Sequence, residues 1–372
     1  MPNDSSGIPL LDVMDVQKRY GGVYALRGVQ LTIRAGEVHA LAGENGAGKS
    51  TLINVLAGAV RRDEGCVVLA GREVDFRSPA ESQATGIAVI HQELATLPTL
   101  SVAENLFMGR LPTRGGWLDR RAMHARAREL LTAVGLDVDP RVAVGTLSRS
   151  HQQLVEIAKA LSASATLLIM DEPSASLTEH ETQHLLGLVR RLRAQGVAIL
   201  YVSHRLSEVF AVCDRITVFR DGRYVRTLDT TDTTPAEVVG LMVGRALTAA
   251  SAESATHERG EPVLEVRGLT RHVRGPAGSG EGSAVPLDDV TLTVGRGEIV
   301  GMAGLIGAGR SEVARAVFGA DSYDAGEIRL SGKRVRFRSP ADAIRAGVAM
   351  VPEDRKALAL FLDKPVRWNI SI

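Results

Sequence analysis

Apolar and polar positions along the first 245 residues follow two alternating patterns. Residues 10–16 and 25–33 alternate apolar and polar side chains on either side of Tyr20-Gly21-Gly22, which predicts two antiparallel strands. Short runs made almost entirely of apolar residues, typical of strands buried on both faces, occur at 38–42, 87–90, 166–170 and 197–202. Helical patterns lie at 51–57, 179–195 and 205–212. This alternation predicts an α/β domain with a mostly parallel sheet at its core.

A block of helices interrupts this plan at about residues 95–163. Ser101 opens the first helix with a capping-box pattern, in which Glu104 stands three positions later. Residues 120–134 form an arginine-rich amphipathic segment, and residues 152–161 carry a third helical pattern. We therefore expect a helical subdomain inserted in the α/β domain, in addition to the antiparallel β subdomain of the opening strands.

The chain repeats itself beyond residue 262. Phe76-Arg-Ser-Pro-Ala80 recurs as Phe337-Arg-Ser-Pro-Ala341, and Lys49 matches Arg310, both 261 positions further on. Such a constant offset, over about fifty residues, indicates a duplicated domain. Small and polar residues between the copies are typical of a linker. The predicted organisation is a first domain at 1–245, a linker at 246–262 and the N-terminal part of a second copy at 263–372. We expect this second copy to be incomplete, because it ends where the first copy has reached only Leu111.

Composition narrows the class of protein. The 372 residues are 45% hydrophobic and 23% charged, which is ordinary for a globular protein. A net charge of +1 argues against a large polyanion-binding surface, so nucleic acid is not an expected partner. Cys66 and Cys213 lie far apart, which favours two buried thiols in a reducing compartment. Without a leader pattern or a run of about 18 apolar residues, the chain is expected to serve any membrane process from the cytoplasmic side, with partners.

The candidate chemistry centres on a glycine-rich loop after the apolar run 38–42. The loop follows the pattern G-x-x-x-x-G-K-[ST], and its residues are Gly43, Glu44, Asn45, Gly46, Ala47, Gly48, Lys49, Ser50 and Thr51. Glycines let successive backbone N–H groups point into one concavity that suits phosphate oxygens. The N-terminus of the following helix adds a favourable dipole. Lys49 supplies a positive charge for the β- and γ-phosphates, and Ser50 supplies a hydroxyl for Mg²⁺.

Two carboxylates, Asp171 and Glu172, end the apolar run 166–170. Strand ends of an open parallel sheet face the ligand crevice. There Asp171 can hold Mg²⁺, directly or through water, and Glu172 can polarise a water molecule for attack on the γ-phosphate. The alternative interpretation is a pair of solvated carboxylates at a strand end.

Three further positions carry weaker signals. Gln92 follows the apolar run 87–90 and could reach the metal or the attacking water, and His204 ends the run 197–202 and could contact the γ-phosphate. A lone glutamine or histidine at a strand end is more often structural. Tyr20 is suited either to stack on adenine or to pack at its turn.

These residues together resemble the motifs of the ATP-binding-cassette (ABC) ATPases. The resemblance makes Tyr20 the adenine-stacking aromatic, Gly43–Thr51 the Walker A loop, Gln92 the Q-loop glutamine and His204 the switch histidine. The remaining motifs fall at Leu147–His151 (signature), Leu167–Glu172 (Walker B) and Ser176–Thr178 (D-loop). More narrowly, the chain resembles the duplicated ATPase subunit of bacterial importers for ribose, galactose, xylose and related sugars. The stretches that carry this closer match are 91–94, 101–106, 152–161, 170–178, 304–312 and 352–356.

The sequence departs from the family pattern in both copies. The signature reads Leu-Ser-Arg-Ser-His in place of Leu-Ser-Gly-Gly-Gln, which puts side chains where close backbone approach to phosphate is wanted. The resemblance still implies nucleotide contacts from Ser148 and Ser150. In the second copy Arg310 replaces the loop lysine, keeping the charge in a planar fork, and the copy lacks its own signature, Walker B and switch histidine. The second, degenerate nucleotide site that the resemblance implies consists of Gly304, Gly309, Arg310 and Ser311.

The resemblance implies an ATPase with ATP and Mg²⁺ as cofactors, catalytic roles for Glu172, His204 and Gln92, and metal contacts from Ser50, Gln92 and Asp171. It also implies that the chain powers sugar import from the cytoplasmic face of the membrane. The implied partners are permease subunits and, indirectly, a periplasmic or lipid-anchored sugar-binding protein. A homodimer through the nucleotide-binding domains is one arrangement that the family allows.

Each ATP in the family lies between the phosphate loop of one domain and the signature of another. We therefore expect the chain to bind ATP but to turn it over slowly, if at all, with any turnover coming from two chains that pair their first domains. Importers of nucleosides or other small polar solutes, and soluble tandem cassettes acting on ribosomes or DNA, remain alternatives. The short Ala/Ser-rich linker counts against the soluble tandem cassettes.

Overall fold

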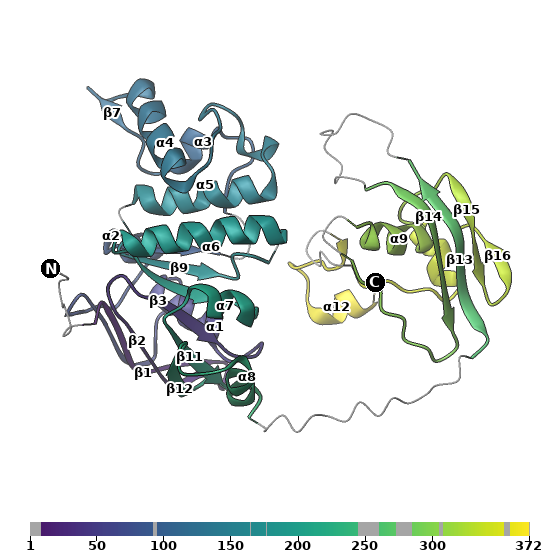
Figure 1. Ribbon diagram of the computed structural model, residues 1–372, viewed down its shortest axis with the longest axis horizontal. Coiled ribbons are helices and arrows are strands. Elements are labelled where there is room, and N and C mark those ends of the chain that lie inside the picture. Colours follow the sequence, from purple (N-terminus) through teal and green to yellow (C-terminus); the bar gives the residue numbers. More distant parts are fainter. Residues whose placement is uncertain are drawn as a thin grey trace. The chain divides into compact units, whose positions relative to one another are not determined.

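The computed structural model describes residues 9–91, 95–163, 165–175, 177–244, 260–272, 285–304, 308–352 and 358–371. The chain divides into two compact units, Met1–Ala250 and Ser251–Ile372 (Figure 1). Most of the predicted linker lies outside the described residues, so the limits given above for the two domains stay a prediction.

A six-stranded sheet in the order β12-β11-β3-β10-β9-β6 forms the centre of the first unit. Its strands are β3 (Val38–Ala42), β6 (Ile87–Ile90), β9 (Leu167–Asp171), β10 (Ala198–Val202), β11 (Arg215–Arg220) and β12 (Arg223–Asp229). All neighbouring pairs are parallel except β11 and β12. Every residue of β3 and β10 is buried, as mostly apolar sequences predict; His39 in β3 is buried with Glu37 and Thr217 as its partners. The expected α/β fold with a mostly parallel core is confirmed.

A four-stranded antiparallel sheet, in the order β2-β1-β4-β5, forms the predicted β subdomain. Its strands are β1 (Leu11–Tyr20), β2 (Val23–Ile33), β4 (Glu64–Leu69) and β5 (Arg72–Glu73). Side chains such as Leu11, Val13 and Leu31 are buried, because alternate residues of a strand point to the same face. Both β1 and β2 reach closer to the Gly21-Gly22 turn than the alternation alone predicts.

Both faces of the six-stranded sheet are covered. Side chains such as Leu41, Ile169 and Leu200 pack in one core with the antiparallel sheet and with α1 (Lys49–Leu56). Their neighbours Ala40 and Met170 pack in a second core on the other face. The helices of that second core include α6 (Glu179–Ala194), α7 (Leu206–Val212) and α8 (Pro235–Val243). A short helix, α2 (Pro79–Ala84), precedes β6.

The helical subdomain lies at one end of the first unit, with β1 and β2 at the other (Figure 1). Its elements are α3 (Val102–Leu106), β7 (Thr113–Arg114), β8 (Trp117–Leu118), α4 (Arg120–Val134), the 3₁₀ helix η1 (Val144–Thr146) and α5 (Arg149–Ser162). The predicted capping box is present, because Ser101 Oγ accepts from the Glu104 N–H and the Glu104 carboxylate accepts from the Ser101 N–H. Helix α4 has the predicted bounds, whereas α5 begins three residues earlier than predicted.

Helix α8 was not predicted, although its sequence carries a start signal. Thr234 caps the helix by accepting a hydrogen bond from the Glu237 N–H, and Pro235 occupies the first turn, where proline is favoured. None of the described helices has the length and apolar character needed to cross a bilayer.

The second unit repeats the opening of the first. Its sheet, in the order β14-β13-β15-β16, contains β13 (Pro262–Arg271), β14 (Leu287–Gly295), β15 (Ala325–Leu330) and β16 (Lys333–Val335). Its helices are α9 (Arg310–Val317), between β14 and β15, and α10 (Pro340–Arg345) and α12 (Val366–Ser371), after β16. The bounds of β15, α9 and α10 lie 261 positions beyond those of β4, α1 and α2. The repeat in sequence is therefore also a repeat in structure.

The repeat breaks down where the parallel sheet would begin. Residues 299–303 and 348–351 correspond to β3 and β6 but are not strands, and Ile299 and Val351 are 98% and 96% exposed. In the first unit β3 bonds to β10 and β11, and β6 bonds to β9. No strand described in the second unit takes these places. An apolar run with no hydrogen-bonding neighbour does not form a strand.

Candidate functional site

The phosphate loop connects β3 to α1, and its outer glycines are held against backbone. Gly48 caps α1 with φ of 99°, in the left-handed region. A Cβ atom there would lie 2.8 Å from the Ala25 carbonyl oxygen, and one on Gly43 would lie 2.5 Å from that of Phe219. Glycine is therefore required at both ends of the loop, while Glu44, Asn45 and Gly46 at its tip are exposed.

The Lys49 ammonium lies across this loop. Its Nζ donates to the carbonyl oxygens of Gly43 at 2.7 Å and Glu44 at 3.0 Å. Burial lowers the pKa of Lys49, and the charges of Glu172 and Asp171 oppose that shift. The lysine charge is thus positioned at the loop and close enough to both carboxylates to interact with them. Ser50 and Thr51 follow in the first turn of α1, and Ser50 is exposed.

Asp171 is the last residue of β9, and Glu172 begins the loop that follows. Burial raises the pKa of Asp171, and the neighbouring Glu172 charge raises it further, while His91 and Lys49 lower it. Glu172 has φ of 48°, a left-handed backbone that is unusual for a residue other than glycine. Its N–H donates to the carbonyl oxygen of Val202 at 2.8 Å, which ties the loop to the end of β10.

His204 meets Glu172 at this edge of the sheet. Because β9 and β10 are parallel neighbours with Asp171 opposite Val202, the residues just beyond both strands lie close together. The distance from His204 Nδ1 to Glu172 Oε1 is 3.1 Å, with the imidazole 63% exposed and the carboxylate side chain 21% exposed. Lys49, Asp171, Glu172 and His204, which lie far apart in sequence, therefore form one cluster.

Other predicted residues stand apart from this cluster or outside the described part of the chain. Gln92 is not among the described residues, so its role stays a prediction. Tyr20 ends β1 with its side chain about half exposed, and the Lys18 ammonium lies 5.6 Å from its ring. This geometry leaves both interpretations of Tyr20 open.

The signature residues begin α5. Ser148 caps that helix by accepting from the His151 N–H at 3.3 Å, and its Oγ lies 2.9 Å from Ser150 Oγ. Ser150 also hydrogen-bonds to Glu181 in the first turn of α6. Among the described residues, neither serine is hydrogen-bonded to the phosphate loop.

The second copy has the same start of a phosphate loop. Gly309 caps α9 with φ of 84°, as Gly48 caps α1, and Arg310 takes the place of Lys49 as the first residue of the helix. Ser311 follows it, and Gly304 lies at the start of the loop, whose residues 305–307 are outside the described part. The side chain of Arg310 is exposed.

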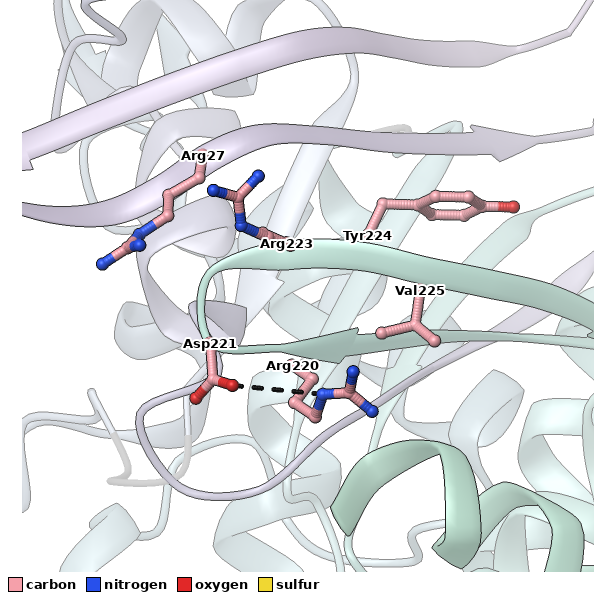
Figure 2. Close-up of a pocket in the computed structure, with 6 residues that line it drawn as sticks. All are labelled: Arg27, Arg220, Asp221, Arg223, Tyr224 and Val225. Atoms are coloured by element: carbon pink, nitrogen blue, oxygen red, sulfur yellow. Dashed lines mark ion pairs between the residues drawn. The ribbon is translucent and has the colours of Figure 1, made fainter. Parts of the chain in front are cut away.

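A basic pocket of about 680 Å³ lies on the first unit beside the turn between β11 and β12 (Figure 2). It is lined by Arg27, Arg220, Asp221, Arg223, Tyr224 and Val225, none of which the sequence analysis selected. The Gly222 carbonyl accepts from the Arg27 N–H at 2.7 Å, and Arg220 donates to a carbonyl of α8. These contacts hold the turn against β2 and α8.

Sequence reasoning missed a buried hydrogen bond close in sequence to both Glu172 and His204. Ser174 and Glu208 are buried and hydrogen-bonded to each other at 2.6 Å. The one signal in the sequence was a glutamate four residues after His204 in a short and mostly apolar helix, because burial of a charged side chain requires partners.

Comparison with known proteins adds independent information. A family model described as "ABC transporter" matches residues 26–175 and 287–366, together more than half of the chain. The "Putative ribose/galactose/methyl galactoside import ATP-binding protein 3" of Burkholderia cenocepacia (strain HI2424) is 48% identical, over 100% of this chain and 70% of that protein. The "Ribose import ATP-binding protein RbsA 3" of Rhizobium meliloti (strain 1021) is 46% identical, over 98% of this chain and 69% of that protein.

Solved structures give the same result for the fold. A nucleotide-free ATP-binding cassette from an ABC transporter is similar with a TM-score of 0.57 and 28% identity, over 63% of this chain and 98% of that chain. The ADP conformation of MJ1267, an ATP-binding cassette of an ABC transporter, is similar with a TM-score of 0.55 and 27% identity, over 64% of this chain and all of that one.

Proposed function

Because this chain belongs to the ABC transporter family and is an ATPase of that family, we propose that it hydrolyses ATP to drive import of a monosaccharide. The sugar would be of the ribose, galactose or xylose type and would cross through a membrane permease. The observation that carries the ATPase role is the meeting of Lys49, Asp171 and the Glu172–His204 pair at one edge of the sheet. The sugar class is inferred from relatives whose names specify import of ribose and galactose.

The nucleotide would bind on the phosphate loop. Backbone N–H groups of residues 43–51 and the N-terminus of α1 favour the phosphates, and the Lys49 ammonium adds a charge-assisted hydrogen bond. Tyr20 would stack on the adenine. Ser148 and Ser150 would contact the nucleotide of a second nucleotide-binding domain, and Gly304, Gly309, Arg310 and Ser311 would form a degenerate second site.

The donor set of this site fits Mg²⁺. Ser50 offers a hydroxyl and Asp171 a carboxylate, and Mg²⁺ prefers such oxygen ligands. The described residues contain no group of three or more His, Cys, Asp or Glu side chains that could hold a metal by themselves. An ion bound by Ser50 and Asp171, with Gln92 as a third protein ligand, would share its remaining positions with phosphates and water, as Mg²⁺ commonly does. When bound, it supplies positive charge that stabilises the phosphates.

Glu172 would act as the general base. Its carboxylate, next to Lys49 and the loop, can accept a proton from the water that attacks the γ-phosphate. His204, at 3.1 Å from Glu172, would orient that carboxylate and donate toward the phosphate. Gln92 would help to position the water.

Coupling to transport would require partners. We propose permease subunits in the membrane and a periplasmic or lipid-anchored sugar-binding protein, with the chain bound peripherally at the cytoplasmic face. Paired nucleotide-binding domains, in a homodimer or with another cassette, would close around ATP and pull on the permease.

Uptake of labelled sugar tests the proposal. Cells that lack the gene should lose accumulation of ribose, galactose or xylose, and the wild-type gene should restore it, whereas a Glu172→Gln gene should not. Pull-down of the chain should recover an integral membrane subunit in the same cells. Unchanged uptake of all three sugars in the deletion strain would overturn the substrate assignment, and recovery of ribosomes in place of a membrane subunit would overturn the transport role.

A further inference from the structure

The loop that carries Glu172 has a backbone that needs support. A residue other than glycine with φ near 48° costs free energy and persists only where its surroundings hold it. The first support is the hydrogen bond from the Glu172 N–H to the carbonyl of Val202. The second is Gln153 of α5, whose buried side-chain amide donates to the carbonyl oxygen of Pro173.

The third support comes from Glu208 in α7. Ser174, two residues after Glu172, donates its hydroxyl to Glu208 Oε2 at 2.6 Å. Both side chains are almost fully buried, with 2% exposure for Ser174 and 4% for Glu208. A hydrogen bond from a hydroxyl to a carboxylate is of the strong, charge-assisted type.

The carboxylate of Glu208 also contacts the residues around His204. The Tyr201 hydroxyl lies 2.8 Å and the Ser203 hydroxyl 3.4 Å from Glu208 Oε2, and Arg205 Nη1 lies 3.3 Å from Oε1. Tyr201 is a fully buried residue of β10, while Ser203 and Arg205 flank His204 in sequence. One buried carboxylate therefore contacts the loop after β9 and the loop after β10.

We propose that Glu208 is a positioning residue for ATP hydrolysis. Glu208 joins Ser174, two residues after Glu172, to Ser203, one residue before His204. It thereby fixes the distance between Glu172 and His204. This inference rests on the proposed function of those two side chains. Packing alone does not require a charge here, because α7 already buries Val209 and Val212, and a buried carboxylate is costly unless several donors satisfy it.

Loss of Glu208 should affect the affinity for ATP and the rate of hydrolysis differently. The hydrogen-bond partners of Glu208 are Ser174, Tyr201, Ser203 and Arg205. None of them belongs to the phosphate loop, so loss of Glu208 should leave ATP affinity near the wild-type value. Loss of alignment between Glu172 and His204 should slow hydrolysis instead, and misplacement by about 1 Å at a catalytic group can cost roughly a hundredfold. We therefore expect Glu208→Ala to reduce the rate at least about tenfold.

The test compares four variants of the whole chain by single-turnover hydrolysis of ATP and by titration with a fluorescent ATP analogue. Glu208→Ala and the milder Ser174→Ala should lower the rate and leave the dissociation constant within about twofold. Glu208→Gln, which keeps one acceptor oxygen for Ser174, should recover part of the rate. Glu37→Gln is the matched control, because it also removes a buried, ion-paired carboxylate but should change only the melting temperature.

A double-mutant cycle then separates positioning from folding. If Ser174→Ala acts through the catalytic pair, it should have little further effect on the rate once His204→Ala is present. Rate losses that simply multiply would overturn the proposal, and so would a Glu208→Ala chain that hydrolyses ATP at the wild-type rate.

Hydrogen exchange tests the connection that Glu208 makes between the two loops without relying on turnover. In Ser174→Ala and Glu208→Ala, the amides of residues 174–175 and of residues 203–205 should both exchange faster. Faster exchange limited to α7 would overturn the proposal even if the rate falls. A wild-type chain that binds ATP but never hydrolyses it, even at concentrations at which two chains pair, would contradict the proposed function. The exchange experiment would still decide whether Glu208 connects the two loops.

Discussion

The contact of Gly48 with β2 gives a prediction that two neighbouring glycines can test against each other. Gly48 and Gly46 both have left-handed backbones, with φ of 99° and 84°. A Cβ atom at Gly48 would lie 2.8 Å from the Ala25 carbonyl oxygen and 2.8 Å from Leu26 Cδ2, whereas one at Gly46 would have no atom within 4 Å. Alanine at either position therefore meets the same backbone strain, but only Gly48→Ala meets a steric clash.

The expected magnitudes follow from these two costs. A left-handed backbone costs an L-residue roughly 1–2 kcal/mol, so Gly46→Ala should lose about that much stability and Gly48→Ala should lose more, because it also meets the clash. In Gly46→Ala the strain is present with and without ATP, so the affinity should change little. In Gly48→Ala the loop must move away from a backbone oxygen of β2, and loss of one charge-assisted phosphate contact is worth roughly 1.5–3 kcal/mol. That loss corresponds to about a ten- to hundredfold weaker binding of ATP.

Titration with a fluorescent ATP analogue, with thermal unfolding of the same samples, measures both effects. The expected result is a lower melting temperature for both variants, with the larger drop for Gly48→Ala, and a much weaker affinity for Gly48→Ala alone. Equal affinities for the two variants, whether both strong or both weak, would refute the reasoning that β2 supports the phosphate loop.

Three further predictions concern charge. Lys49→Ala should weaken ATP binding at least about tenfold, because a charge-assisted hydrogen bond is lost; an affinity equal to wild type in the same titration would contradict this. Asp171→Asn should shift the dependence of hydrolysis on added Mg²⁺ to higher concentration, because one of the metal's oxygen ligands loses its charge; an unchanged MgCl₂ titration against an EDTA control would contradict this. Burial alone would raise the pKa of Glu37, but hydrogen bonds from His39 and Arg215 outweigh it and lower that pKa to about 2 from 4.5. The stability this provides should be lost as pH falls from about 4.5 toward 2, and urea unfolding of wild type against Glu37→Gln should show the difference shrinking over that range.

Much of the first unit could be predicted from the sequence. The strands β3 and β6 have the predicted bounds, because a short and mostly apolar run between turns leaves few alternatives. The phosphate loop and the Asp171-Glu172 pair were found from local patterns, and the parallel order of β9 and β10 brings His204 to Glu172. That meeting confirms that the strand ends converge, while the catalytic roles stay a proposal.

Other features depend on contacts between residues that are distant in sequence. The Ser174–Glu208 hydrogen bond joins residues 34 positions apart, and no local pattern predicts it. Residues 299–303 fail in the opposite way: their sequence matches that of β3, yet they do not form a strand. The strands that would be their hydrogen-bonding neighbours are not among the described residues of the second unit. A strand is a property of its partners as well as of its own sequence.

The central claim is that Glu172 performs the chemistry at a site that binds ATP without it. Glu172→Gln keeps the shape of the side chain and removes its ability to act as a base. We predict unchanged affinity for ATP and single-turnover hydrolysis slower by at least roughly a hundredfold. Hydrolysis at the wild-type rate would contradict the claim, and loss of ATP binding together with hydrolysis would show that Glu172 supports the structure of the site instead.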